Sequence, residues 1–385
     1  NECYNRAVVL KPNFAEAHNN LGISLKDQGK LDEAIDSYNK ALLLVPDYAD
    51  AYNNMGNAFK YKGKLNKAIE SYKNAISIKP DYAKGFINLG VAFKYQGKLD
   101  KAIEAYNKAL SLKPDYIEAF HNLGNALADQ GKQDEAIEAY EKALLLKPDY
   151  EAARVQKLYQ QANICDWHSI EKDRKLIPSL GISEKHINPL AILSLEDAPE
   201  RHYMRSRIYA KNKFPEKPIS FQTKTLKKSE RIRIGYISSD FVNHPVAYLI
   251  AKVIELHNRD KFEIFAYSLI GSKDDELRKR LIKSFDVFKD VSGISDKEVA
   301  VVCRQDNIDI AIDLNGYTRN SRTRIFAYRA APIQINYLGY PGTLGSYFID
   351  YIIADPIIIP ADFRNFYYEN IIYMPHTYQP TDDTR

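Results

Sequence analysis

The sequence predicts an α-solenoid of short helical repeats followed by a Rossmann-like α/β lobe. Two observations support this: a period of 34 residues in the first 150 residues, and an alternation of apolar runs with helical patterns after Lys228. Of the 385 residues, 45% are hydrophobic and 27% charged, which is typical of globular chains. We expect a repeat array with a closing helix at 1–163, a mixed linker region at 164–228 and the lobe at 229–385.

Charge, hydropathy and cysteine spacing argue against several classes of protein. The 54 basic and 50 acidic residues leave a net charge of +4, which is too even for a nucleic-acid-binding face. No apolar run reaches about eighteen residues, so we expect no membrane partner. Cys3, Cys165 and Cys303 lie far apart without disulfide or metal-ligand spacing, which favours a reducing, cytoplasmic location and no metal site.

The period of 34 residues is that of the tetratricopeptide repeat. It is carried by Pro12, Pro46, Pro80, Pro114 and Pro148, and by two glycine series, Gly22, Gly56, Gly90, Gly124 and Gly29, Gly63, Gly97, Gly131. The first glycine of each pair lets the two helices of a unit approach closely, and the second suits a left-handed turn between them. Neither helix can bury its apolar face alone, so the units are expected to stack around a concave groove.

One polar position inside each first helix recurs with the same period, as Asn20, Asn54, Asn88 and Asn122. Each amide is either satisfied by a neighbouring backbone group, or belongs to a ladder that donates to and accepts from the backbone of an extended peptide. Both alternatives stay open at this point. The regular step fits a partner that runs along the groove, so we expect protein or peptide partners there.

The second part alternates strands and helices. Strands are expected at 231–238, 261–269, 308–316, 333–339 and 350–355, and helices at 189–210, 245–257, 274–285, 296–305 and 322–330; residues 212–222 are expected to be extended. Such alternation favours a parallel sheet with helices on both faces. Ligands of these folds gather beyond the carboxyl ends of the strands.

Three polar loops follow expected strands and define a candidate site. "SSDFVNHP" contains His244, "DLNGYT" begins with Asp313, and "LGYPGTLG" spans residues 338–345. Alone, the His-Pro pair is as well explained as a helix start capped by Asn243, and the glycine loop as a turn. Together the loops are more specific, because one sheet would bring them to the same edge.

At these residues the chain resembles a known family. Behind the repeats, "GYISSDFVNHP", "DLNGYT", "APIQINYLGYPGT", "DYIIAD" and "YMPHTY" resemble, in order, the O-linked N-acetylglucosamine transferase and SPINDLY-like family of protein O-glycosyltransferases. The resemblance covers nearly the whole chain. It implies an inverting GT-B enzyme, built of two Rossmann-like lobes, that transfers a sugar from a nucleotide sugar such as UDP-N-acetylglucosamine to Ser or Thr. It implies no metal or other cofactor, and an asparagine ladder that grips the protein substrate.

The resemblance also assigns site residues. His244 matches the family's active-site histidine by motif, and Asp313 is the second candidate for a catalytic base or orienting group; which of the two is the base stays open. The residues expected to bind substrate are Asn315, Tyr317, Tyr340, Gly342 and Thr343.

The chain stops at Arg385, about where the first catalytic lobe of the family ends. The second lobe, which resembles the nucleotide site, is missing, so we expect a C-terminally truncated fragment that is inactive alone. Two alternatives stay open: a repeat-based protein-interaction module with a non-catalytic lobe, and a glycosyltransferase with a non-protein acceptor.

Overall fold

The computed structural model describes residues 2–183, 187–214, 231–271 and 275–383, which divide into two compact units, Asn1–Lys172 and Asp173–Arg385. The boundary falls inside the expected linker 164–228. Residues from Asp173 onward are part of the second unit, whose core includes Phe214, 7% exposed. Most of the segment 212–222, expected to be extended, lies outside the described residues.

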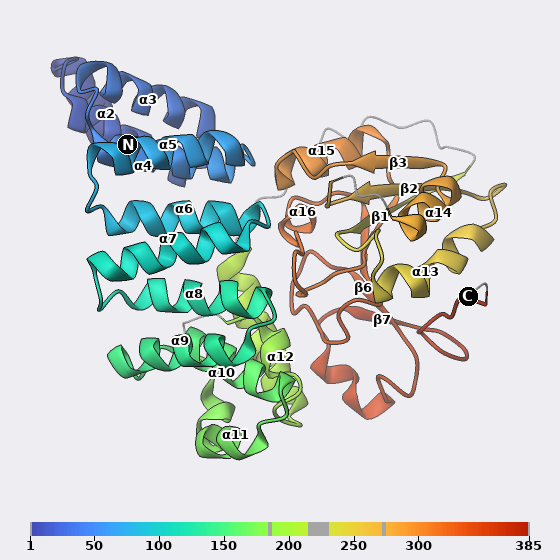
Figure 1. The fold of residues 1–385 in the computed structure, drawn as a ribbon. Coiled ribbons are helices and arrows are strands. Elements are labelled where there is room, and N and C mark those ends of the chain that lie inside the picture. The colour runs from blue at the N-terminus through green and yellow to red at the C-terminus, as the bar shows by residue number, and fades with distance from the viewer. Residues whose placement is uncertain (1, 184–186, 215–230, 272–274, 384–385) are drawn as a thin grey trace. The chain divides into compact units, whose positions relative to one another are not determined.

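The first unit is a stack of helix pairs (Figure 1). Its helices are α1 (Glu2–Leu10), α2 (Ala15–Asp27), α3 (Leu31–Leu44), α4 (Ala49–Tyr61), α5 (Leu65–Ile78), α6 (Ala83–Tyr95), α7 (Leu99–Leu112), α8 (Ile117–Asp129), α9 (Gln133–Leu146), α10 (Glu151–Asn163) and α11 (Trp167–Asp173). Helix α10 is the expected closing helix, and its Val155 and Leu158 are buried.

The two recurring glycines of each repeat act by different physical means. A Cβ on Gly22 would lie 2.5 Å from the ring of Tyr38, which is fully buried and fills the space above the glycine. The second glycine, Gly29, has nothing within 4 Å of a Cβ, but its φ of +77° lies in the left-handed region. The ring contact and the left-handed φ recur in the other three repeats, with Tyr72, Tyr106 and Tyr140 as the rings and Gly63, Gly97 and Gly131 as the turn glycines. Close approach and turn geometry are therefore separate requirements, as the period predicts.

The second unit contains a parallel sheet with strand order β3-β2-β1-β4-β5-β6-β7. The strands are β1 (Ile232–Ser238), β2 (Phe262–Ser268), β3 (Val287–Asp290), β4 (Ile310–Asp313), β5 (Ile333–Asn336), β6 (Tyr351–Ala354) and β7 (Asn370–Tyr373). The five expected strands are present. Strands β3 and β7, the two edges of the sheet, were not predicted; each has only four residues, none of them fully buried.

The helices of this unit are η1 (Arg174–Ser179), η2 (Pro189–Ile192), α12 (Pro199–Lys213), α13 (Pro245–Leu256), α14 (Glu276–Ser284), α15 (Asp296–Gln305), α16 (Arg324–Ala327) and η3 (Ala361–Phe366). The helix expected at 189–210 is divided into η2 and α12, and Pro199 begins the second piece. The helix expected at 322–330 shortens to the four residues of α16, since Arg329 turns out of the helix with a φ of +60°.

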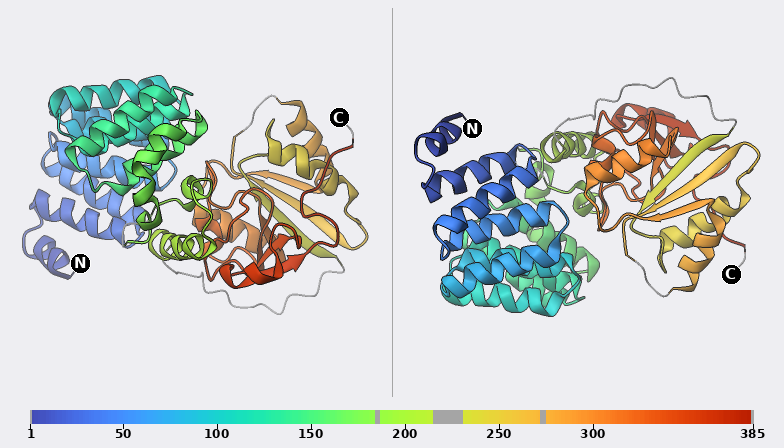
Figure 2. Two further views of the ribbon diagram at one scale, coloured as in Figure 1. Left: turned by 90° about the horizontal axis from the view of Figure 1, so that it is seen from below. Right: turned by 90° about the horizontal axis from the view of Figure 1, so that it is seen from above.

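Helices cover both faces of the sheet (Figure 2). On one face, α13 and α14 contribute Ile250, Ile254 and Leu281 to the core. On the other, α15 and α16 contribute Val299 and Phe326. The strand order reverses direction between β1 and β4, so the loops after these two strands open at the topological switch point, where such sheets bind ligands.

Candidate functional site

The loops that follow β1 and β4 are tied together by one buried amide. Strand residues Ile237 and Asp313 pair in register, so both loops begin at the same edge. The Asn315 Oδ1 atom accepts a hydrogen bond of 2.8 Å from the Ser239 backbone N–H, and its Nδ2 donates to Asp240 Oδ2 at 2.6 Å and to Ser239 Oγ at 3.0 Å. Asn315 is 1% exposed. Asn315 therefore positions the loop after β1. Substrate contact was the role expected for it, but its hydrogen bonds go to this loop.

His244 begins helix α13 and remains open to solvent. Its Nδ1 accepts the Val246 N–H at 3.3 Å, so the histidine itself caps the helix, in place of the Asn243 cap considered from sequence. The same Nδ1 lies 3.7 Å from Asp240 Oδ2, and the side chain is 43% exposed. The imidazole is thus anchored through Nδ1, while the ring remains accessible.

Asp313 ends β4 as a buried carboxyl group with one oxygen unpaired. Oδ1 accepts the backbone N–H groups of Asn315 (2.9 Å) and Gly316 (3.0 Å), whereas Oδ2 has no hydrogen-bond partner among the described residues. Burial raises the pKa of Asp313 to about 6; the two N–H bonds oppose this rise, and the charge of Asp240 adds to it. The free oxygen and the raised pKa make Asp313 a carboxyl group able to exchange a proton near neutral pH.

Asp240 connects the two candidate residues, although sequence reasoning did not select it as a site residue. Burial raises its pKa, and the charge of His244 with the hydrogen bonds from Ser239 and Asn315 works against that rise. His244 thus lies beside the carboxyl group of Asp240, whose charge in turn raises the pKa of the buried Asp313, and such a set of groups could move a proton. Asp240 lies four residues before His244 in the same loop, and this short spacing is the feature of the sequence that could have identified it as a site residue.

Tyr317 and Tyr340 were expected to line the cleft, but the structure places both in the core, each 1% exposed. The Tyr317 hydroxyl donates to the Leu344 carbonyl at 2.5 Å. Its ring packs edge-on against Tyr209 (4.8 Å between centroids) and parallel to Phe214. Both partners come from residues 187–214, which sequence analysis treated as linker. The tyrosines are buried because that segment covers them.

The third loop also reaches the switch point. A Cβ on Gly339 would lie 1.9 Å from the Leu314 carbonyl oxygen, so the chain passes directly against the loop after β4. Gly342 and Thr343, both expected to bind substrate, line a pocket of about 420 Å³. The Thr343 hydroxyl, however, is already engaged, because it donates to Glu369 Oε2 at 2.6 Å.

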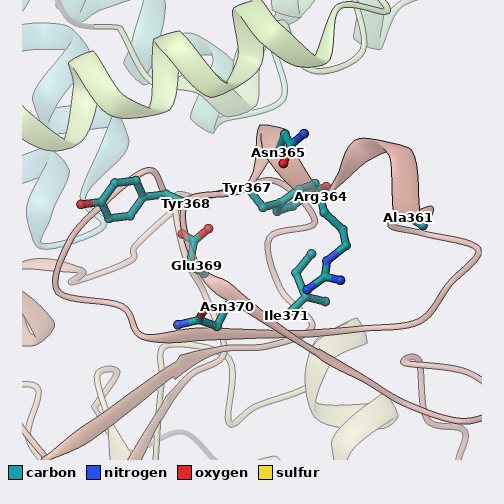
Figure 3. Close-up of a pocket in the computed structure, with 8 residues that line it drawn as sticks. All are labelled: Ala361, Arg364, Asn365, Tyr367, Tyr368, Glu369, Asn370 and Ile371. Carbon is teal, nitrogen blue, oxygen red and sulfur yellow. The ribbon is translucent and has the colours of Figure 1, made fainter.

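Glu369 is a second buried carboxyl group that sequence reasoning missed. Its Oε1 accepts the Leu344 N–H at 2.7 Å, and burial raises its pKa despite the hydrogen bonds from Thr343 and the backbone. Glu369 also borders a polar pocket of about 370 Å³ that Arg364 and Tyr367 help to line (Figure 3). No motif marks this glutamate, which lies 26 residues after its threonine partner and contacts it only through the fold.

In the repeat unit, the asparagine ladder is partly satisfied by a neighbouring side chain. Asn54 Nδ2 donates to Asn19 Oδ1 at 3.0 Å, and Asn88 Nδ2 donates to Asn53 Oδ1 at 2.8 Å. Each bond joins successive repeats. The acceptor is the side-chain amide of another asparagine, whereas the sequence had suggested a backbone group. The position that would serve Asn122 is Ile87, so this link is absent there. Half-buried ladder amides that use Nδ2 internally keep Oδ1 as an acceptor.

No three His, Cys, Asp or Glu side chains of the described chain gather in a way that could hold a metal ion. Within the residues that the structure describes, too, every helix is too short or too polar to cross a bilayer.

The fold and site define a repeat-bearing α/β protein with a cluster of polar side chains, Asp240, His244, Asp313 and Asn315, at the switch point of a Rossmann-like sheet. Residues 149–385 match the model of glycosyl transferase family 41, and the chain belongs to this family. Tetratricopeptide repeat models match residues 3–36, 24–60, 56–95, 92–131 and 117–150.

Curated relatives share parts of the chain. A probable UDP-N-acetylglucosamine–peptide N-acetylglucosaminyltransferase, SEC of Arabidopsis thaliana, is 42% identical over 153 residues, which cover 40% of this chain and 16% of the relative. The UDP-N-acetylglucosamine–peptide N-acetylglucosaminyltransferase of Caenorhabditis elegans is 36% identical over 231 residues, 56% of this chain and 20% of the relative. The chain therefore spans about a fifth or less of the length of these relatives.

A solved structure resembles most of the chain. A mutant of the Thermobaculum terrenum O-GlcNAc transferase is 26% identical, with a TM-score of 0.55 over 86% of this chain and 58% of the solved one. The order of repeats and α/β lobe predicted from sequence is thus found in a related protein.

Proposed function

We propose that this chain is the acceptor-binding part of a protein O-glycosyltransferase that transfers N-acetylglucosamine from UDP-N-acetylglucosamine to Ser or Thr hydroxyls with inversion. The observation that carries the proposal is the position of His244, which is open to solvent at the switch point with Asp240 and Asp313 behind it. The names of the relatives from Arabidopsis thaliana and Caenorhabditis elegans support the donor and the acceptor class.

The chemistry is a displacement at the anomeric carbon. A bond forms between the acceptor oxygen and that carbon, the bond to the diphosphate breaks with the nucleotide leaving, and the hydroxyl proton passes to a base. In the proposal, no metal or other cofactor takes part, as the family resemblance implies. The nucleotide sugar is a co-substrate.

His244 is the better placed of the two candidate bases. To accept a proton at Nε2, the neutral ring must carry its own proton on Nδ1. In this structure Nδ1 accepts the Val246 N–H, so that hydrogen bond must be given up when the ring acts as the base. Asp240 Oδ2, 3.7 Å from Nδ1, is the acceptor that would favour the required tautomer and stabilise the imidazolium. Asp313 is only 3% exposed, so it would not contact the acceptor; it would act indirectly, by carrying part of the negative charge that Asp240 presents to His244.

The repeat groove would supply the acceptor. The ladder residues Asn54 and Asn88 join successive repeats and leave their amide oxygens for the N–H groups of an extended peptide. We infer that the repeat unit binds a protein segment, which is why the proposal names proteins as acceptors.

The test is sugar transfer to a peptide by the gene product that contains this chain. His244→Ala should lower kcat by at least about a hundredfold, because both proton removal and acceptor orientation depend on the imidazole. His168→Ala, which changes a histidine of the other unit, is the matched control and should leave the rate unchanged. An undiminished rate in His244→Ala would contradict the assignment, and the absence of any transfer would favour the interaction-module alternative.

A further inference from the structure

The first helices of the repeats carry a second recurring row of polar side chains. Lysines recur as Lys26, Lys60 and Lys94, and the next position reads Asp27, Tyr61, Tyr95 and Asp129 along the array. A lysine seven residues after the Asn19 or Asn53 position lies on nearly the same side of the helix, because two helical turns take about seven residues. We call Lys26, Lys60 and Tyr61 the lysine strip. Its lysines lie on the same side of their helices as Asn19 and Asn53, the amides that bond to the ladder residues Asn54 and Asn88.

In the lysine strip, two ammonium groups surround one aromatic ring. Lys26 Nζ lies 5.9 Å and Lys60 Nζ 5.7 Å from the centroid of the Tyr61 ring. Tyr61 is nevertheless 63% exposed, so its ring remains available on the surface. A cation held over a ring face is attracted by the negative face of the ring.

The ion pairs along the row are uneven. Lys26 pairs with Asp27 at 2.8 Å, and Lys94 pairs across repeats with Asp129 at 3.3 Å. Lys60 has no carboxylate within ion-pair distance among the residues that the structure describes. Burial, and then the charge of Lys26, lowers the pKa of Lys60.

We propose that the lysine strip is a subsite of the repeat groove that binds carboxylate side chains of an extended acidic peptide. An Asp or Glu from the partner would give Lys60 the counter-charge that Asp129 gives Lys94, and the Tyr61 ring would pack against the methylene groups of that side chain. The adjacent amide ladder suits a peptide backbone, and the nearly even charge of the chain argues against a nucleic acid. The identity of the peptide as an acceptor rests on the proposed function.

The experiment measures binding to the whole chain by fluorescence anisotropy, without nucleotide sugar. Two labelled peptides are compared, one of alternating Glu and Ala and one of alternating Gln and Ala. At low salt the Glu peptide should bind about tenfold more tightly, and high salt should remove the difference. Lys60→Met should weaken the Glu peptide about fivefold and leave the Gln peptide unchanged.

The matched control is Lys30→Met, which removes one positive charge from the same array. Lys30 pairs with Glu33 at 3.7 Å and is about half exposed, so its loss should leave both peptides unaffected. Thermal unfolding of both variants checks that they fold. Because Lys60 is held without a counter-charge, Lys60→Met should be at least as stable as the parent chain.

Three results would overturn the inference: equal binding of the two peptides, no effect of Lys60→Met, or tighter Lys60-dependent binding of a single-stranded oligonucleotide. The proposed function fails independently. If the gene product binds the Glu peptide selectively but transfers no sugar, the lysine-strip inference stands and the proposed enzymatic function fails. If it transfers sugar but shows no Glu selectivity, the proposed function stands and the lysine-strip inference fails.

Discussion

The repeat unit and the α/β unit use glycine in opposite ways. In the repeats, Gly90 and Gly97 do the same two tasks as their counterparts in the other units, so their purpose is visible from the period alone. In the α/β unit, Gly339 is required by one carbonyl oxygen, that of Leu314, in the loop that follows β4. Local, repeated contacts can be predicted from the sequence, whereas contacts made once between distant segments cannot.

The largest expected effect is the loss of stability of the α/β unit when the contact between Gly339 and Leu314 is disrupted. Gly339→Ala would place a Cβ 1.9 Å from the backbone oxygen of Leu314, so the two loops must separate. We expect a loss of about 4 kcal/mol or more in the free energy of unfolding of this unit. Hydrogen exchange of each unit measures it separately, because a two-unit chain need not unfold in one step.

Gly56→Ala is the matched substitution in the repeats. Its Cβ would meet the buried Tyr72 ring at 2.6 Å, and a ring can shift further than a backbone carbonyl. The loss should be smaller, about 2 kcal/mol, and confined to the repeat unit. An equal loss for both substitutions would contradict the distinction between side-chain and backbone contacts.

The next effect concerns the buried carboxyl group of the site. The folded-state pKa of Asp313 is about 6, above its ordinary value of 3.8, so folding favours its protonated form. This contribution to stability is fully present below about pH 4 and is lost as the pH rises through 6, which amounts to about 3 kcal/mol at most. Asp313→Asn should therefore make the α/β unit more stable than the parent above pH 6 but not at pH 4.

Denaturant unfolding at the two pH values checks this prediction. Asparagine keeps an oxygen that can accept the N–H groups of Asn315 and Gly316, so the loop geometry should survive. A stability difference that does not change with pH would show that Asp313 is not the titrating group.

The smallest effect belongs to the turn glycine of the repeats. Gly97→Ala meets nothing within 4 Å, so its only cost is the left-handed φ of +73°. We expect a loss of about 1–2 kcal/mol, measured by thermal unfolding of the repeat unit. A loss as large as that of Gly56→Ala would mean that the turn and the helix contact are not separate requirements.

The candidate site was predictable in its position more than in its members. The strands that end at Ser238 and Asp313 were recognisable, and so was the meeting of their loops. The division of roles was not: Asn315 holds a loop and Tyr317 lies in the core, because residues 187–214 cover it. Glu369 carried no signal, since its partner Thr343 is distant in sequence.

The sequence by itself determined the repeat period, the closing helix, the main strands and the polar loops at their ends. These features depend on contacts within a few tens of residues and on side-chain periodicity, both of which can be read along the chain. Only the tertiary structure decided which polar groups lost their solvent. The raised pKa of Asp313 follows from burial by segments distant in sequence. Among the described residues, Lys60 lacks a counter-charge because Tyr95 of the next repeat occupies the position from which Asp129 pairs with Lys94.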